Sequence, residues 1–145
     1  MAAGPWVIYN EFKAAYGLKL LNLNTDSMKV ALFLSTSNAG SASLTTARYA
    51  TLTNQAANAN GYTTGGVVCA PTYSQTGGTA TFDIADAAWT ASGGSITARF
   101  AVLYDDTAAN KDLICYCLLD STPADVTTTT GNTLTIQIAN IYTMA

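Results

Sequence analysis

Residues 96–104 read Ile-Thr-Ala-Arg-Phe-Ala-Val-Leu-Tyr, and every second side chain in this stretch is apolar. Successive side chains of an extended strand point to opposite faces. One face therefore carries Ile96, Ala98, Phe100, Val102 and Tyr104. This alternation predicts a β-strand with one face in a core. A Ser-Gly-Gly turn precedes the stretch and an acidic loop follows it.

Further strand patterns, separated by turn residues, occupy most of the remaining chain. Segments 27–35 and 112–120 carry apolar residues on both faces, which predicts central strands. Shorter strands are predicted at 18–23, 67–75, 79–84, 87–90 and 133–138. Pro71, inside the second of these, predicts an edge strand or a bulge. The fold class predicted is all-β: an antiparallel, jelly-roll-like β-sandwich.

One helix is predicted near the N-terminus, over residues 9–16. Apolar side chains there recur at i, i+3 and i+4, Asn10 is placed to cap the helix, and Gly17 is placed to end it. Segment 36–60 is too long for a structureless connection, so a short helical turn is expected at 45–52.

The composition is poor in charged residues. Only 10% of the 145 residues are charged, the net charge is −3 and histidine is absent. A typical domain carries about 25% charged residues. Hydroxyl and amide groups lose less on leaving water than ions do, so such a surface is suited to being covered by other protein. The length predicts a single domain over residues 1–145, with segments 1–8 and 139–145 as candidate arms.

Several partner classes are disfavoured by the sequence. Six cations without a cluster give no basic footprint, so no nucleic-acid partner is predicted. The apolar runs are too short to span a bilayer, so no membrane partner is predicted. No secretory signal is recognised at the N-terminus, which favours a cytoplasmic product. The three cysteines, Cys69, Cys115 and Cys117, are expected to be buried and reduced.

Acidic residues form two groups. Asp105, Asp106 and Asp112 could hold calcium through loop oxygens, but solvated loop carboxylates are the preferred interpretation. Asp83 and Asp86 could form a hydrolase pair, but a turn or an ion pair with Arg99 is preferred. No metal site and no cofactor are predicted, because a zinc site would need more ligands than the cysteines supply.

Four residues are candidate interface residues. Trp6, Tyr62 and Tyr142 fall in termini or loops, where they could stack on sugar or anchor in another subunit. Arg99 is either a partner of a carboxylate or an intermolecular contact, since arginine is enriched at interfaces.

Catalytic motifs are absent from the sequence. A Ser-His-Asp triad requires histidine, and no phosphate-binding or nucleophile-elbow motif occurs. The chain is therefore predicted not to be an enzyme and to have no catalytic residues. A cell-wall hydrolase that uses Asp83, Asp86 or Asp105 is kept as a minor hypothesis.

Several blocks resemble a family of small virion proteins of tailed bacteriophages, similar to head decoration (capsid cement) proteins. The blocks are Asp26–Leu32, Gly61–Gly66, Thr81–Asp83 with Trp89-Thr90, and Gly93–Thr107, and the last is the most specific. Together they lie within residues 10 to 138. The resemblance supplies no active-site residues.

The resemblance and the composition together predict a non-enzymatic structural protein of the virion. It would bind the outer capsid surface and cement adjacent major capsid proteins. The expected partners are the major capsid protein and copies of itself, as a dimer or trimer. The expected location is the capsid surface, after assembly in the host cytoplasm. The alternative is a tail or fibre-associated module, with glycan as its ligand.

Overall fold

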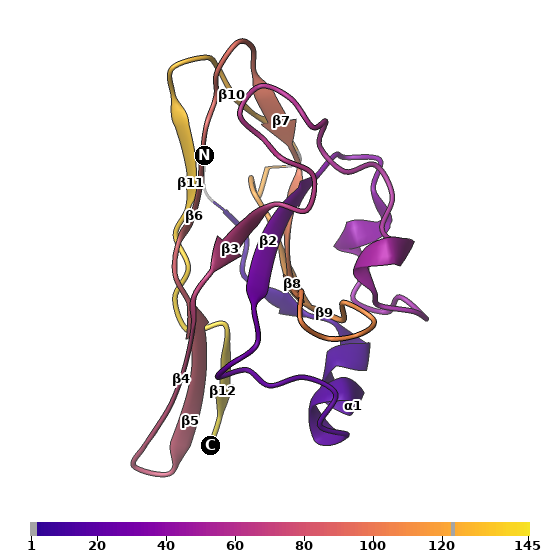
Figure 1. The fold of residues 1–145 in the computed structure, drawn as a ribbon, viewed down its shortest axis with the longest axis vertical. Coiled ribbons are helices and arrows are strands. Elements are labelled where there is room, and N and C mark those ends of the chain that lie inside the picture. The colour runs from indigo at the N-terminus through magenta and orange to yellow at the C-terminus, as the bar shows by residue number, and fades with distance from the viewer. Residues whose placement is uncertain (1–2, 123) are drawn as a thin grey trace.

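A computed structural model describes residues 3–122 and 124–145 (Figure 1). These described residues are mostly β, with one short helix near the N-terminus and two 3-10 turns. In chain order the elements are β1 (Val7–Ile8), α1 (Asn10–Gly17), β2 (Met28–Phe33), η1 (Asn38–Gly40), η2 (Tyr49–Thr51), β3 (Val67–Cys69), β4 (Pro71–Thr76), β5 (Thr79–Ile84), β6 (Ala87–Thr90), β7 (Ile96–Ala98), β8 (Phe100–Asp105), β9 (Leu113–Leu118), β10 (Val126–Thr128), β11 (Thr133–Ile136) and β12 (Tyr142–Met144).

The central layer is an antiparallel sheet in the order β1-β9-β8-β2-β3. The prediction that segments 27–35 and 112–120 form central strands is confirmed by β2 and β9, which are covered on both faces. Val30 and Leu32 of β2 enter one core, whereas Ala31 and Phe33 enter the other. This arrangement explains why these segments lack the polar–apolar alternation of a one-sided strand.

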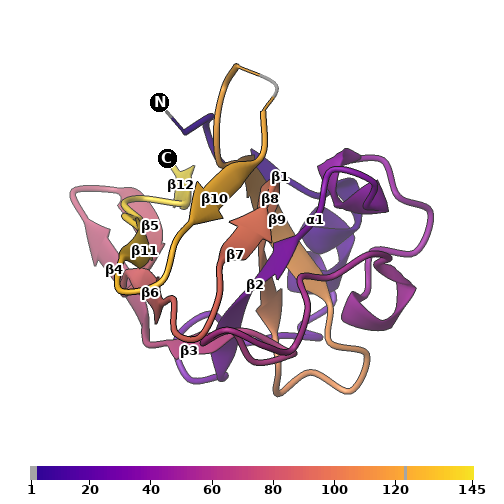
Figure 2. The same cartoon turned by 90° about the horizontal axis from the view of Figure 1, so that it is seen from above.

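The second layer packs on one face of the central sheet (Figures 1 and 2). It consists of β12-β5-β4 and the pair β11-β6, with the pair β10-β7 at one end of the molecule. Phe82, Ile84 and Trp89 of this layer meet Val30, Leu32 and Leu103 of the central sheet in the larger core. The all-β, sandwich-like fold with a short N-terminal helix is as predicted.

The opposite face of the central sheet is covered by irregular chain and the two 3-10 turns (Figure 2). The smaller core lies there and includes Phe33, Val102 and Tyr104. Tyr9 is wholly buried in it and donates its hydroxyl proton to the Ala39 carbonyl, 2.6 Å away. The helical turn expected within 45–52 is present as η2, whereas η1 was not predicted.

Two predicted strands each divide between layers. Segment 67–75 breaks at Ala70, just before Pro71: β3 pairs with β2 in the central sheet, and β4 pairs with β5 in the second layer. Segment 96–104 breaks at Arg99, because β7 pairs with β10 whereas β8 pairs with β2 and β9. Strands that switch sheets form the corners of such a sandwich. The prediction of an edge at Pro71 is confirmed, since β4 is outermost in its sheet.

The predicted helix is confirmed, shifted by one residue to Asn10–Gly17. The predicted cap is wrong: the N-cap is Tyr9, and its side chain makes no capping hydrogen bond. Phe12 and Ala15 are buried and dock the helix on the larger core, so packing holds this two-turn helix in place.

The candidate arms are built into sheets. Val7 and Ile8 of segment 1–8 pair with β9, and residues 1 and 2 of that segment lie outside the described residues. In segment 139–145, β12 pairs with β5 through Tyr142, Thr143 and Met144. Both termini therefore contribute edge strands, which sequence patterns of two or three residues are too short to reveal.

Candidate interaction surface

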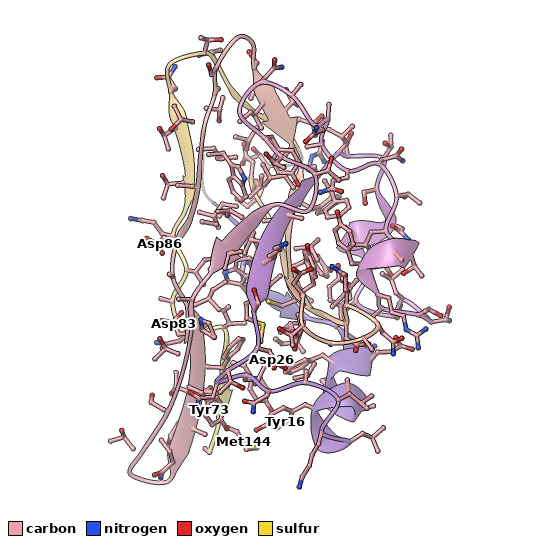
Figure 3. All side chains as sticks on the ribbon, viewed as in Figure 1. Tyr16, Asp26, Tyr73, Asp83, Asp86 and Met144 are labelled. Carbon is pink, nitrogen blue, oxygen red and sulfur yellow. The ribbon has the colours of Figure 1, made fainter. Side chains whose placement is uncertain are left out.

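A groove of about 800 Å³ opens where α1, the following loop and the second layer approach one another. We call it the base groove. Tyr16 and Tyr73 point toward one another across this end of the molecule (Figure 3). The groove is lined by residues of four segments: Tyr16, Gly17, Lys19 to Asn24, Asp26, Tyr73 and Thr107 to Ala109.

The loop that forms one wall was predicted to be a strand at 18–23, and this prediction is wrong. The chain turns back after α1, and Lys19 adopts the left-handed conformation with φ 58°. Leu21 and Leu23 then point into the core. Leu18 and Leu20 point outward and are 70% and 52% exposed. The leucines of this segment do alternate between exposed and buried positions. The buried ones, however, belong to a loop that forms no strand pairing.

Local hydrogen bonds hold this loop in shape. Asn22 Oδ1 accepts from the backbone N–H of Asn24, at 3.0 Å. Asp26 Oδ2 accepts from the backbone N–H of Asn22, at 2.5 Å. Such side-chain to backbone bonds compete with strand pairing and favour turns.

The aromatic wall of the groove is formed by Tyr16 and Tyr73, and Tyr142 packs behind it. The hydroxyls of Tyr16 and Tyr73 are hydrogen-bonded at 3.1 Å, and this bond is the main cause that raises the pKa of Tyr16. Tyr142 contacts Phe12 edge-on, with ring centroids 5.8 Å apart, and lies 6.4 Å from the ring of Tyr16. Tyr142 is thus half-buried beside the groove, held by α1.

Tyr62 is 3% exposed, so its expected place at the surface is wrong. Its hydroxyl accepts hydrogen bonds from the Leu32 backbone N–H at 3.0 Å and from Gln55 Nε2 at 2.6 Å. Its ring lies 6.0 Å from that of Trp89. Burial raises the pKa of Tyr62. Trp6 is half-buried and packs against the larger core, away from the groove.

Arg99 makes an intramolecular ion pair, but with Asp125 rather than with Asp83 or Asp86. Its Nε donates to Asp125 Oδ1 at 2.8 Å. Asp83 Oδ1 accepts from the backbone N–H of Ile84, and Asp86 Oδ1 accepts from that of Ile138. Figure 3 shows both aspartates on the second layer.

The three loop aspartates have separate roles. Asp106 pairs with Lys29 at 2.8 Å and also with Lys111, and its hydrogen bonds to these two lysines lower its pKa. Asp105 is fully buried, and desolvation raises the pKa of Asp112. In residues 3–122 and 124–145, no three metal-binding side chains converge on one point.

The cysteines are free and buried, as predicted. Burial raises the pKa of Cys69 to about 11 and that of Cys117 to about 12, and it raises the pKa of Cys115 strongly. Since the thiolate is the reactive form, these groups are packing residues.

Comparisons with known proteins gave no match to a family model, to a curated protein or to a solved structure. Within the described part of the chain, no helix has the length and apolar character needed to cross a membrane.

Proposed function

We propose that this protein is a non-enzymatic structural protein of a bacteriophage virion, which binds the outer capsid surface and cements adjacent major capsid proteins. The single observation that carries the proposal is the base groove together with the exposed side chains of Leu18 and Leu20, which we call the leucine rim. Leu18 and Leu20 are among the few large apolar side chains left exposed; Leu20 lines the groove, and Leu18 lies two residues before it, where α1 ends. Exposed apolar groups that rim a concavity are typical of protein contact sites.

The charges support the same proposal. Of the six cationic side chains, Lys29, Lys111 and Arg99 are engaged in ion pairs within the molecule. Because only 10% of the residues are charged and half of the cations are already paired, few ions are desolvated when a neighbour covers the surface. A protein that binds by burying neutral surface can stay soluble alone and still adhere to a shell.

The sandwich also offers several short edge strands to neighbours. β3 and β1 end the central sheet, and β4 and β12 end the outer one. Strand edges carry unpaired backbone N–H and C=O groups that another chain can use. The expected partners are therefore the major capsid protein and further copies of this chain, as a dimer or trimer.

A second candidate function is a glycan-binding module of the tail or a fibre. The observation that favours it is the make-up of the base groove, where the rings of Tyr16 and Tyr73 lie near the amides of Asn22 and Asn24. Aromatic faces and amide groups are the side chains that contact sugar rings. A glycan array would test this function directly.

Copy number distinguishes the two functions. Quantitative mass spectrometry of purified virions would measure the ratio of this protein to the major capsid protein. A decoration protein is expected in a copy number close to the number of capsomers in the shell. A ratio typical of tail components would refute capsid decoration and leave the glycan-binding module as the better account.

A further inference from the structure

Asp105 ends β8 in a fully buried position, opposite Met28 of β2. Its Oδ1 accepts two hydrogen bonds from backbone N–H groups, from Thr107 at 2.8 Å and from Ala108 at 3.0 Å. Its Oδ2 is buried as well, and within the described part of the chain it has no hydrogen-bond donor. A buried carboxylate oxygen without a donor is costly, and it needs a specific explanation.

Asp26, on the wall of the base groove, is the acidic side chain that acts on the Asp105 carboxyl, and the neighbouring backbone ties the two segments together, since the Ser27 carbonyl accepts from the Asp106 N–H at 2.8 Å. Figure 3 shows Asp26 below β2, at the end of the molecule where the groove lies. The second oxygen of Asp26 is held by the Asn22 backbone N–H, which limits how far the carboxyl can turn away. Two carboxylates this close repel each other unless something lies between them.

The nearby charges do not relieve this repulsion. Asp106 faces the ammonium groups of Lys29 and Lys111, so these two cations are already engaged. Asp112, at the start of β9, contributes its backbone carbonyl, which accepts from the Asp105 N–H at 3.0 Å. Asp26 is therefore the charged group that acts on the Asp105 carboxyl.

We propose that Asp105 and Asp26 bind one proton between them, and that this shared proton is a pH-sensitive clasp between β8 and the loop of the base groove. With the proton present, one carboxyl donates to the other and the buried oxygen is satisfied. Without it, two anions face each other and the loop that carries Leu18 and Leu20 is less firmly held.

Titration behaviour agrees with this geometry. The pKa of Asp105 is raised to about 6, chiefly by burial and in part by the Asp26 carboxyl, against the lowering effect of the Ala108 and Thr107 N–H groups. An unfolded aspartate titrates near 3.9. The folded state therefore binds the extra proton between about pH 4 and pH 6, so stability is greatest below this window and falls as the pH rises through it.

The test compares the wild-type protein with Asp105→Asn by urea denaturation between pH 4.5 and pH 7.5. An asparagine keeps the acceptor for Thr107 and Ala108, and its amide can donate to Asp26 at every pH. The wild-type folding equilibrium should weaken by up to about tenfold per pH unit up to pH 6. Asp105→Asn should lose this part of the slope and equal or exceed the wild type at pH 7.

Asp83→Asn is the matched control, because the Asp83 carboxylate also accepts a backbone N–H, and its hydrogen bond involves no other carboxylate. It should keep the wild-type slope. If Asp105→Asn fails to fold, the carboxyl carbon of Asp105 in the wild type can be followed by NMR, with an expected midpoint near pH 6. Equal slopes in wild type and Asp105→Asn, or a midpoint near pH 4, would overturn the proposal. So would millimolar Ca²⁺ that stabilises the wild type at pH 7 but not Asp105→Asn, because a metal would then occupy the site.

Discussion

The leucine rim gives the sharpest prediction, through the double variant Leu18→Ser, Leu20→Ser. The two side chains are 70% and 52% exposed, which together amounts to a little more than one fully exposed leucine. Burying a whole leucine is worth about 1.5–3 kcal/mol. Full contact of both with the capsid would therefore contribute about 2–4 kcal/mol, a loss of roughly 30- to 700-fold in affinity when they are removed.

The free protein should hardly change. Both side chains already contact water, so the free energy of unfolding should shift by less than about 0.5 kcal/mol. The assay is co-sedimentation with expanded capsids that lack decoration, combined with urea denaturation of the free protein. Val68→Ser is the control, because Val68 is 60% exposed on β3 and does not line the groove. Equal binding by the double variant and by wild type would refute the assignment of the groove as the contact site.

Three further predictions concern the free fold. Gly66→Ala should destabilise the protein by at least about 2 kcal/mol in thermal melts, because φ is +80° and a Cβ would lie 1.8 Å from the Val30 carbonyl oxygen. Gly17→Ala is the control: it has open space around it and should be neutral or slightly stabilising. Tyr9→Phe should cost about 1–3 kcal/mol in urea denaturation, since it leaves the buried Ala39 carbonyl without its donor. The three buried thiols should resist a thiol reagent at pH 8 until the protein unfolds, and rapid labelling of the native state would contradict their packing role.

Sequence patterns predicted the central elements well where burial alone decides the structure. Segment 27–35 is apolar on both faces because two cores lie on either side of β2. Hydrophobic periodicity does not reveal which sheet a strand joins. For that reason segments 67–75 and 96–104 were each predicted as one strand, although each crosses between layers.

The candidate surface was less predictable, because it is built from distant parts of the chain. Tyr16 and Tyr73 are far apart in sequence, and only the fold brings their hydroxyls to 3.1 Å. Tyr62 occurs in a loop sequence but is buried, because its hydroxyl satisfies the Leu32 N–H. One usable signal lay in segment 18–23, where apolar residues alternate without a strand partner; its outward half is the leucine rim.

The most direct test of the central claim, adhesion through a neutral surface, is the salt dependence of binding to undecorated capsids. At 1 M salt the screening length falls to about 3 Å, and binding driven by charge weakens steeply. We predict a Kd that changes by less than about threefold between 0.05 M and 1 M salt, because the leucine side chains that carry the contact are uncharged. A Kd that rises tenfold or more over this range, or no binding at any salt concentration, would contradict the account.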